Sequence, residues 1–449
     1  LTEVLFPGAL QRADELDKYL KENGKPVGPL HGVPVTVKDQ FDVEGYDSTI
    51  GYVGRAYKPA SKDALMVTLL RDLGAVVIAK TNLPQTIMWC ETDNPLWGCT
   101  THPSDANLTP GGSSGGEAAA LALHGSILGW GTDIGGSIRI PAHMNGLYGL
   151  KPSSGRLPYA GLTNSTDGQE HVPSVVGPLA RSLSSITLAV RSVIDTNPWL
   201  HDPKCHPLQW RGEIHDEVQT RKLTVGVLLD DGVVKVHPPI KRIILHVASK
   251  LKDQGHEIIE WTSDLHSEVV DVMDTYYTSD GGADILADLS VAGEPRIPHV
   301  RALLDRAKGK ALSVDQYWQL NRRRLAAQTA YLEKWNRTHS STGACVDAIL
   351  CPVMPHCAVA HGNCKWVGYT KVWNVLDYSA LVLPGGLVDK NLDVKEDYQP
   401  RNELDAWNWG LWDPDAMHGL PVGIQLVGRK LEEEKLLGIG NVLDSLADT

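Results

Sequence analysis

Two short segments rich in glycine and serine carry the residue types that nucleophilic chemistry needs. The first reads TPGGSSGGE over residues 109–117, and the second reads GTDIGGSIR over residues 131–139. Glycines let the backbone adopt dihedral angles that other residues avoid, so successive N–H groups can turn toward one point and form an anion-binding nest. Ser137 follows Gly135 and Gly136 at the end of such a nest. A serine hydroxyl beside a pocket for an oxyanion is what acyl transfer requires.

Lys38 is the third candidate group, and it ends the β-branched run PVTVK. A serine hydroxyl attacks an amide only when a base removes its proton, and a lysine serves as that base when it is neutral. Free lysine titrates near ~10.4, and burial lowers that pKa by several units. The apolar neighbours Val35, Val37 and Phe41 predict that at least the aliphatic part of Lys38 is buried.

Each of these signals also has an ordinary structural interpretation. A Gly/Ser loop before a helix is more often a phosphate-binding loop or a plain turn, although no Gly-Lys-Ser/Thr follows here. The segment 131–137 could be a structural turn between a strand and a helix, and Lys38 could be a surface lysine beside Asp39. Only the joint presence of the three segments points to a catalytic site.

The elements that must position these residues alternate between strand and helix. In the first half we predict strands over 34–38, 75–79 and 126–130, helices over 64–73 and 117–124, and a tight turn over 131–137. The helix after the first Gly/Ser loop would direct its free N–H groups toward the two serines of that loop.

The second half of the chain shows the same alternation of strands and helices. We predict strands over 223–229, 257–261, 348–352 and 422–427, a helix over 240–252, a long helical region over 300–335 and a polar surface loop over 389–404. Such alternation implies an α/β fold in which helices cover both faces of a large, mainly parallel or mixed sheet. No internal repeat or low-complexity linker divides the chain, so we predict one domain over residues 1–449.

The whole pattern resembles the amidase signature family. The stretch 111–141, GGSSGGEAAALALHGSILGWGTDIGGSIRIP, carries the resemblance, with GVPVTVKD at 32–39 and GLYGLKPSSGRLP at 146–158. Ser113 and Ser137 lie 24 positions apart, which matches the family's bridging and nucleophilic serines. The likeness is strong to about residue 181, with a signature core over about 25–181. It returns in three segments that look most like the fungal acetamidase branch, at 350–355, 369–380 and 419–429.

The resemblance implies an amidase that hydrolyses a carboxylic amide to the carboxylate and ammonia or an amine. Ser137 would be the nucleophile that carries the acyl group, and Lys38 would be the base. Ser113, after a cis peptide bond from Gly112, would bridge them and pass a proton to the leaving nitrogen. The oxyanion would be bound by the backbone N–H groups of Ile134, Gly135, Gly136 and Ser137. The residues that would support these groups are Ser114, Thr132, Asp133 and Arg139.

Three further expectations follow from the resemblance. Likeness to fatty-acid amide hydrolases places Ile87 and Met88 in an acyl channel, although both suit an ordinary core equally well. Thr101-His102-Pro103 stands where relatives usually have Asn-Pro, a departure in the loop before GGSSGG that changes no member of the triad. Family chains normally begin further upstream, so an N-terminal helical portion is expected to be missing here.

Two other functions share part of the pattern. Residues 112–116 satisfy the G-x-S-x-G motif of α/β-hydrolases, which would make the protein an esterase-type enzyme with a downstream histidine such as His143 or His171. That alternative leaves Lys38 and the turn 131–137 unexplained. A glutaminase subunit of a tRNA-dependent amidotransferase shares the whole signature, and the acidic balance and the fungal-type C-terminal segments argue against it.

Charge and composition limit the classes of partner and the cellular location that we expect for this protein. The chain has 42 Lys+Arg against 54 Asp+Glu, a formal charge of −12, so we expect no nucleic-acid partner. No apolar run approaches the ~20 residues of a membrane helix. The first ten residues lack signal-peptide features, and an odd number of cysteines, seven, predicts reduced thiols and a cytoplasmic location.

Thiols and imidazoles gather between residues 345 and 364, without the CxxC or HExxH spacing of metal sites. This cluster comprises Cys345, Cys351, His356, Cys357, His361 and Cys364. Apolar neighbours favour buried thiols, so we predict no metal and no cofactor. The expected partner is a small-molecule amide, and the chain could assemble as a homodimer.

Overall fold

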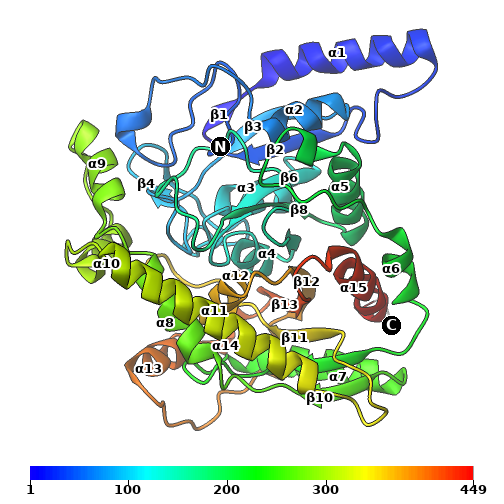
Figure 1. Ribbon diagram of the computed structural model, residues 1–449, viewed down its shortest axis with the longest axis vertical. Coiled ribbons are helices and arrows are strands. Elements are labelled where there is room, and N and C mark those ends of the chain that lie inside the picture. The colour runs from blue at the N-terminus through cyan, green and yellow to red at the C-terminus, as the bar shows by residue number, and fades with distance from the viewer. Residues whose placement is uncertain (448–449) are drawn as a thin grey trace.

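One large mixed sheet runs through residues 1–447, the part of the chain that the computed structural model describes (Figure 1). The strands are β1 (Glu3–Val4), β2 (Pro34–Lys38), β3 (Val76–Thr81), β4 (Asp93–Asn94), β5 (Gly98–Cys99), β6 (Leu128–Asp133), β7 (Tyr148–Lys151), β8 (Val175–Ala180), β9 (Thr224–Val227), β10 (Glu257–Glu260), β11 (Ala348–Pro352), β12 (Ala380–Leu387) and β13 (Pro421–Val427). Eleven of them form the sheet in the order β1-β3-β2-β6-β8-β7-β12-β13-β11-β9-β10, and β4 pairs with β5.

Helices fill most of the connections between these strands. They are α1 (Phe6–Asn23), α2 (Leu65–Asp72), α3 (Gly115–Ala122), α4 (Arg139–Asn145), α5 (Leu183–Asp195), α6 (Gly212–Glu217), α7 (Pro238–Asp253), α8 (His266–Tyr276), α9 (Ala283–Ala292), α10 (Pro298–Ala307), α11 (Val314–Arg337), α12 (Gly368–Val375), α13 (Glu403–Gly410), α14 (Pro414–Met417) and α15 (Glu433–Ala447). Within residues 1–447, no helix combines the length and apolarity that a membrane span requires.

The strand directions decide where the catalytic candidates meet. β2 pairs in parallel with β3 on one side and with β6 on the other, with Val35 opposite Leu128 and Val37 opposite Trp130. The carboxyl ends of parallel neighbours lie at the same edge of a sheet. Lys38 therefore lies beside the last residues of β6, from which the turn to Ser137 departs.

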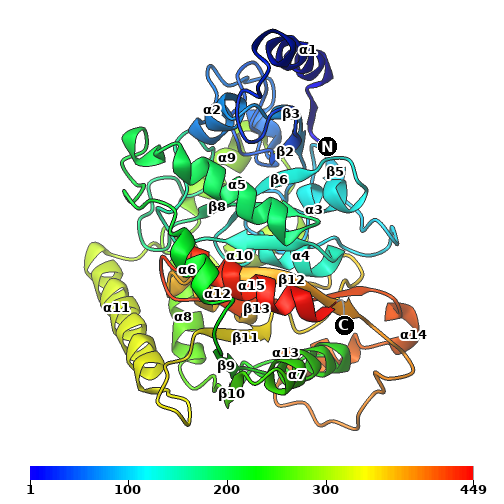
Figure 2. The same ribbon diagram turned by 90° about the vertical axis from the view of Figure 1, so that its right-hand side faces the viewer.

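Both faces of the sheet are covered, as the alternation predicted (Figure 2). Successive side chains of a strand point to opposite faces. In β11, Ala348 and Leu350 belong to the core cluster that contains the apolar side of α7. Ile349 and Cys351 belong to a second cluster with aromatic residues of α11 and α12. The predicted α/β fold with a large mixed sheet is confirmed.

Most predicted elements are present, with two corrections. The helical region predicted over 300–335 is two helices, α10 and α11, because Lys308 and Gly309 adopt left-handed φ angles of 52° and 62° that no helix continues through. The turn predicted over 131–137 begins later than expected. Gly131–Asp133 still pairs with β8 as part of β6, so the turn starts at Ile134.

Three central strands were missing from the sequence prediction, namely β7, β8 and β12. β8 reads VVGPLA and β12 reads ALVLPGGL, so each contains glycine and proline, which normally weaken a strand pattern. β12 tolerates them with a register shift between Pro384 and Gly386. Long ladders with β6 and with β13 hold β8 and β12 extended despite their local sequence, and the short β7 pairs between these two strands.

Candidate active site

Lys38 ends β2 with its side chain fully buried at 0% exposure. Its Nζ lies 2.7 Å from Ser113 Oγ and 3.0 Å from Thr132 Oγ1. No carboxylate of residues 1–447 forms an ion pair with it. The structure thus places one candidate serine in direct contact with the lysine and surrounds the amine with hydroxyl groups.

Burial controls the protonation of Lys38. Desolvation lowers its pKa from 10.5 to about 7, although Asp133, Glu117 and Asp39 pull the pKa upward. Glu117 of α3 is itself fully buried, and desolvation raises its pKa to about 7. Its carboxyl accepts hydrogen bonds from the hydroxyls of Thr36 and Thr81. Both groups titrate near neutrality, so a neutral lysine is accessible at ordinary pH.

The first Gly/Ser loop brings Ser113 and Ser114 to the start of α3. The peptide bond between Gly112 and Ser113 is cis. A Cβ on Gly112 would lie 2.4 Å from the carbonyl oxygen of Glu91, so only glycine fits this close approach of two backbones. The backbone N–H of Ser114 donates to the carbonyl of Ser137 at 3.1 Å. That bond ties the two Gly/Ser segments together.

The second segment forms a turn of free N–H groups around Ser137. Gly136 has a φ of 132°, and a Cβ there would lie 2.5 Å from Thr370 Oγ1. Its N–H donates to Asp133 Oδ1 at 2.9 Å, so it cannot at the same time bind an oxyanion as expected. This corrects the predicted set of donors. The N–H groups of Ile134, Gly135 and Ser137 have no acceptor within residues 1–447 and stay available.

Asp133 and Arg139 form a buried ion pair that holds this turn. Arg139 Nη2 and Nε donate to the two Asp133 oxygens at 2.9 and 3.0 Å, and both side chains are 0% exposed. Arg139 also donates to Asn374 Oδ1 at 2.7 Å and to Gln425 Oε1 at 2.8 Å. Burial alone would raise the pKa of Asp133, and the guanidinium reverses this and holds that pKa well below its usual range. The Asp133 carboxylate therefore stays ionised beside Arg139.

Ser137 lies where two cavities meet, with 9% of its surface exposed. One cavity has a volume of about 350 Å³ and the other about 250 Å³. Ile87, Met88 and Ile134 line both, so the structure brings the two predicted channel residues to the junction. The Ser137 hydroxyl has no hydrogen-bond partner among the described residues, and so the expected bond between Ser113 and Ser137 is not formed in this structure.

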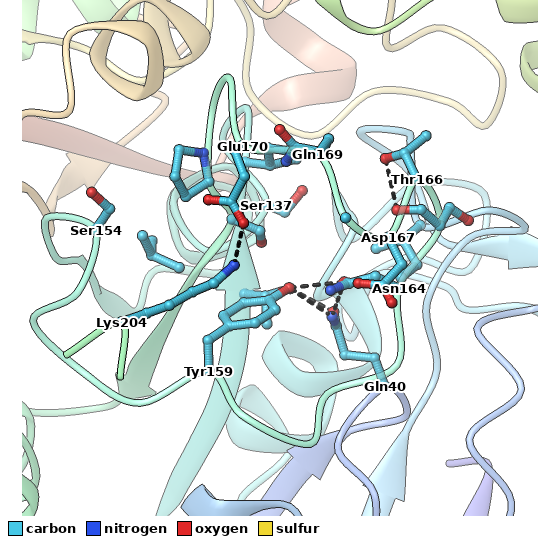
Figure 3. A pocket seen from close by; sticks show the side chains of 18 of the residues that line it. Gln40, Ser137, Ser154, Tyr159, Asn164, Thr166, Asp167, Gln169, Glu170 and Lys204 are labelled. Atoms are coloured by element: carbon cyan, nitrogen blue, oxygen red, sulfur yellow. Dashed lines mark hydrogen bonds and ion pairs between the residues drawn. The ribbon is translucent and has the colours of Figure 1, made fainter. Parts of the chain in front are cut away.

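The larger cavity is polar (Figure 3). Ser113, Thr132 and Gln40 line its inner end. On one wall, the Tyr159 hydroxyl donates to Asn164 Oδ1 at 2.8 Å, and Gln40 Nε2 donates to the same oxygen at 3.0 Å. At the mouth, charged side chains from two loops face each other. Lys204 Nζ and Glu170 Oε1 form an ion pair there at 2.7 Å.

The smaller cavity is mainly apolar, and Gly112 and Gly135 line it without Ser113. Its further lining comes from Trp89, Ile140, Leu303, Trp366, Val367 and Tyr277. Lys371 is its buried cation, and its Nζ donates to Asp274 Oδ1 at 2.6 Å. The sequence analysis did not predict the polar residues Asp274 of α8 and Lys371 of α12, which line this smaller, apolar cavity. Lys371 lies inside the family-like segment 369–380, which was the only available signal.

The histidine alternative finds no support in the geometry. No histidine among residues 1–447 forms a hydrogen bond with Ser113, Ser114 or Ser137. His143 contacts the backbone of Gly423 and His356, and His171 stacks on Tyr276. Ser114 is fully buried, and its Oγ donates to the carbonyl of Thr132 at 3.5 Å, so it does not have the exposed position of a nucleophile.

Two sequence features that lie outside the triad have structural roles. His102, in the loop that departs from the family pattern, contacts the carbonyl of Met144 through Nε2 at 2.9 Å and accepts from the Ser104 N–H. Across residues 1–447, no three His, Cys, Asp or Glu side chains converge as metal ligands would. Cys90 Sγ donates to the carbonyl of Cys364, a contact between the cavity wall and the cysteine-rich segment.

Comparisons with known proteins agree with this geometry. A family model described as Amidase matches residues 1–437. Amidase 1 of Gibberella moniliformis is 53% identical over 448 residues, which cover 99% of this chain and 86% of that protein. An acetamidase of Emericella nidulans is 42% identical and covers 98% of this chain and 81% of its own length. These fungal relatives confirm the branch that the C-terminal segments predicted.

A solved structure of a fatty acid amide hydrolase has the same fold. It superposes with a TM-score of 0.93 at 33% identity, over 100% of this chain and 78% of that one. A structure described as a bacterial aryl acylamidase of the amidase signature enzymes superposes with a TM-score of 0.77 at 21% identity, a likeness of fold alone. Together with the family match along the chain, these findings show that the protein belongs to the amidase signature family, hydrolases that act on the carbon–nitrogen bonds of amides.

Proposed function

We propose that the protein hydrolyses a carboxylic amide through an acyl-enzyme on Ser137, with Ser113 as the bridge and Lys38 as the base. One observation carries the proposal: a fully buried lysine, with a pKa lowered by burial to about 7, lies 2.7 Å from Ser113 Oγ at the foot of the cavity that Ser137 also lines. A base matched to neutral pH and in reach of a hydroxyl is what activation of a serine needs.

The proposed reaction moves two protons through Ser113. As Ser137 Oγ bonds to the amide carbon, its proton passes to Ser113 Oγ, and the proton of Ser113 passes to neutral Lys38 Nζ. The tetrahedral oxyanion accepts hydrogen bonds from free N–H groups of the turn 134–137. The C–N bond then breaks as Lys38 returns its proton through Ser113 to the leaving nitrogen. Water repeats the sequence on the ester and releases the carboxylate.

The gap between the two serines fits this scheme. Catalytic hydrogen bonds are often long in a free enzyme and tighten when substrate binds. Ser137 is already tied to the first loop through the bond from the Ser114 N–H to its carbonyl. A rotation of the Ser137 side chain, rather than a movement of the backbone, would complete the relay.

We assign the leaving nitrogen of the substrate to one cavity and its acyl group to the other. Ser113 lines only the polar cavity, so the leaving nitrogen, which receives its proton from Ser113, faces that side. Gly135, one of the free oxyanion donors, lines only the apolar cavity, which we assign to the acyl group. A cavity of roughly 150 Å³ holds benzene. The acyl cavity, at about 250 Å³, would thus hold an aryl or medium-length alkyl group.

The nucleophile is tested by covalent labelling. A fluorophosphonate should inactivate the enzyme, and peptide mass mapping should find the label on Ser137, because this serine alone of the three lines both cavities. Label on Ser114 would remove the triad from consideration. A panel of primary amides with aryl, alkyl and acetyl groups, assayed for ammonia, would then define the substrate. A glutaminase-subunit function would show instead as glutamine turnover that depends on a partner protein.

The base is tested by the pH dependence of kcat/KM. The reactive form of Lys38 is neutral and its pKa is about 7. Activity should therefore rise with pH through about 7 and level off above it. Activity that is constant from pH 5 to 9, or that needs a protonated group, would contradict a lysine base.

A further inference from the structure

Gln40 is a buried amide, 1% exposed, that lies between the lysine and the polar cavity. It comes two residues after Lys38, where β2 has ended. Its Oε1 accepts a hydrogen bond from Thr132 Oγ1 at 2.6 Å, and Thr132 Oγ1 is also the second partner of Lys38 Nζ. A chain of hydrogen bonds therefore runs from the amine through a hydroxyl to this amide.

The orientation of the Gln40 amide is fixed from its other end. Nε2 faces Asn164 Oδ1 at 3.0 Å and the backbone carbonyl of Thr163 at 3.4 Å. A backbone carbonyl only accepts, so the nitrogen must lie on that side and the oxygen must face Thr132. The backbone N–H of Thr163 donates to the Gln40 carbonyl at 2.9 Å and holds the loop and the glutamine together.

We infer that Gln40 is a positioning residue that acts on Lys38 through Thr132. A threonine hydroxyl has one proton, and an amide oxygen can only accept it. Thr132 therefore gives its proton to Gln40 and can only accept from Lys38. A neutral lysine amine has two N–H groups and one lone pair. With one N–H donated to Thr132, the lone pair is left for the hydroxyl of Ser113, the other partner of Nζ.

Loss of the acceptor oxygen would let Thr132 turn. Its hydroxyl could then donate to the lone pair of neutral Lys38 and compete with Ser113 for it. The charged and titratable groups that face Lys38 are Asp133 from β6, Glu117 from α3 and its neighbour Asp39. None of them hydrogen-bonds to Thr132 Oγ1 among the described residues, so only Gln40 sets the direction of this hydroxyl. The inference rests on the proposed function of Lys38 as base.

A matched pair of substitutions isolates the acceptor oxygen. Gln40→Met and Gln40→Glu both remove the amide donor to the loop 163–164, and only the glutamate keeps an oxygen for Thr132. We expect the high-pH plateau of kcat to fall at least about tenfold in Gln40→Met and to stay within about threefold of wild type in Gln40→Glu. The acid limb of the pH profile should move to lower pH in Gln40→Met, because a donating Thr132 stabilises the neutral amine.

Coupling to Thr132 is the second measurement. In a Thr132→Val background, Gln40→Met should change kcat by less than about twofold, since the hydroxyl through which it acts is gone. Thermal unfolding checks that each variant is folded, and Gln40→Leu replaces Gln40→Met if the latter unfolds below the assay temperature.

Three results would overturn the inference. They are a wild-type plateau and acid limb in Gln40→Met, equal losses in the methionine and glutamate variants, and full additivity with Thr132→Val. The Lys38→Met variant separates this failure from that of the proposed function. If Lys38→Met is active, the lysine base is wrong; if it is inactive while Gln40→Met behaves as wild type, only the role of Gln40 is wrong.

Discussion

Arg139 and Lys38 are both fully buried beside the end of β6, and each contacts one of its last two residues, yet their partners differ in kind. Successive residues of a strand point in opposite directions, so Thr132 faces the lysine and Asp133 faces the arginine. Arg139 meets a carboxylate and two amide oxygens. Lys38 meets two hydroxyls.

The type of cation and the partners that it meets together decide whether each group can lose its proton. A guanidinium keeps its proton at any ordinary pH, whereas a buried lysine amine loses its proton more easily, and the two hydroxyls offset the desolvation of the Lys38 ammonium only in part. Arg139 and Asp133 form a fixed ion pair that supports the turn carrying Ser137. Lys38, with a pKa of about 7, can lose and regain its proton. The end of β6 thus lies between a fixed ion pair and a lysine whose protonation can change near neutral pH.

Removing the base should have the largest effect on activity. Lys38→Met keeps the length of the side chain and removes the amine, and amide turnover should fall about a thousandfold or more. The measurement is kcat/KM on the best substrate of the amide panel. If Lys38→Met retained more than about one tenth of wild-type activity, another residue would have to be the base. The contrast between a titratable Lys38 and a structural Arg139 would then be wrong.

The same Lys38→Met substitution should raise stability. The unfolded lysine keeps its proton up to about pH 10.5, and the folded one releases it above about pH 7. The unfolded state then binds more protons between these values, so wild-type stability rises with pH across this window. The destabilisation by burial is full below about pH 7. We expect urea unfolding at pH 7 to show a gain of about 1–4 kcal/mol, shrinking toward pH 10.

Arg139→Met should change the free energy of unfolding in the opposite direction and destabilise the protein. It leaves the carboxylate of Asp133 buried without its cation, which costs about 3–5 kcal/mol of unfolding free energy. The double variant Asp133→Asn with Arg139→Met should recover part of that loss, because no uncompensated charge is left. Equal shifts for Lys38→Met and Arg139→Met would show that the two cations are held alike.

Gly135→Ala should reduce activity with a smaller change in stability. A Cβ at this position would lie 2.2 Å from Tyr277 Oη, so either the free N–H of Gly135 or the tyrosine must move. Misplacement of a catalytic donor by this amount lowers kcat/KM by about 10- to 100-fold.

The collision itself can be tested by rescue. Adding Tyr277→Phe removes the oxygen that the new methyl group meets and should restore most of the lost activity. Gly8→Ala serves as a matched control, because no heavy atom lies within 4 Å of a Cβ built at that helical glycine. A loss in Gly135→Ala that Tyr277→Phe leaves unchanged would place the fault in the backbone of the turn.

The smallest effect on stability and activity is expected from a substitution of Lys204 at the mouth of the polar cavity. Lys204 and Glu170 are 65% and 66% exposed, so Lys204→Ala should change the unfolding free energy by less than about 1 kcal/mol. If the leaving amine occupies this cavity, KM should rise for N-substituted amides that extend toward the mouth and stay constant for primary amides, which release ammonia. A shift in KM for both classes would move the acyl group to this side.

Residue types and short-range spacing were enough to predict the candidate catalytic groups and several of the elements that carry them. Ser113, Ser137 and Lys38 were predicted as the triad from residue type, glycine context and family-like spacing. The elements β2, α3 and β11 were predicted from patterns that depend only on neighbouring residues, and the structure contains all three. Such signals are local, because periodicity and glycine dihedrals act over a few positions. The same locality explains why β8 and β12 were not predicted: glycine and proline obscure the strand pattern of two segments that pairing with β6 and with β13 holds extended.

Tertiary structure alone decided how those groups are protonated and what surrounds them. The pKa of Lys38 depends on desolvation by the whole fold and on hydroxyls from two other segments, and the donor at Gly136 was lost to Asp133, a contact that spacing does not reveal. Gln40 has its role only because Thr132 and Asn164, 92 and 124 positions away in sequence, close around it. Electrostatics in a protein interior act through space, and only the folded chain brings these atoms within that range.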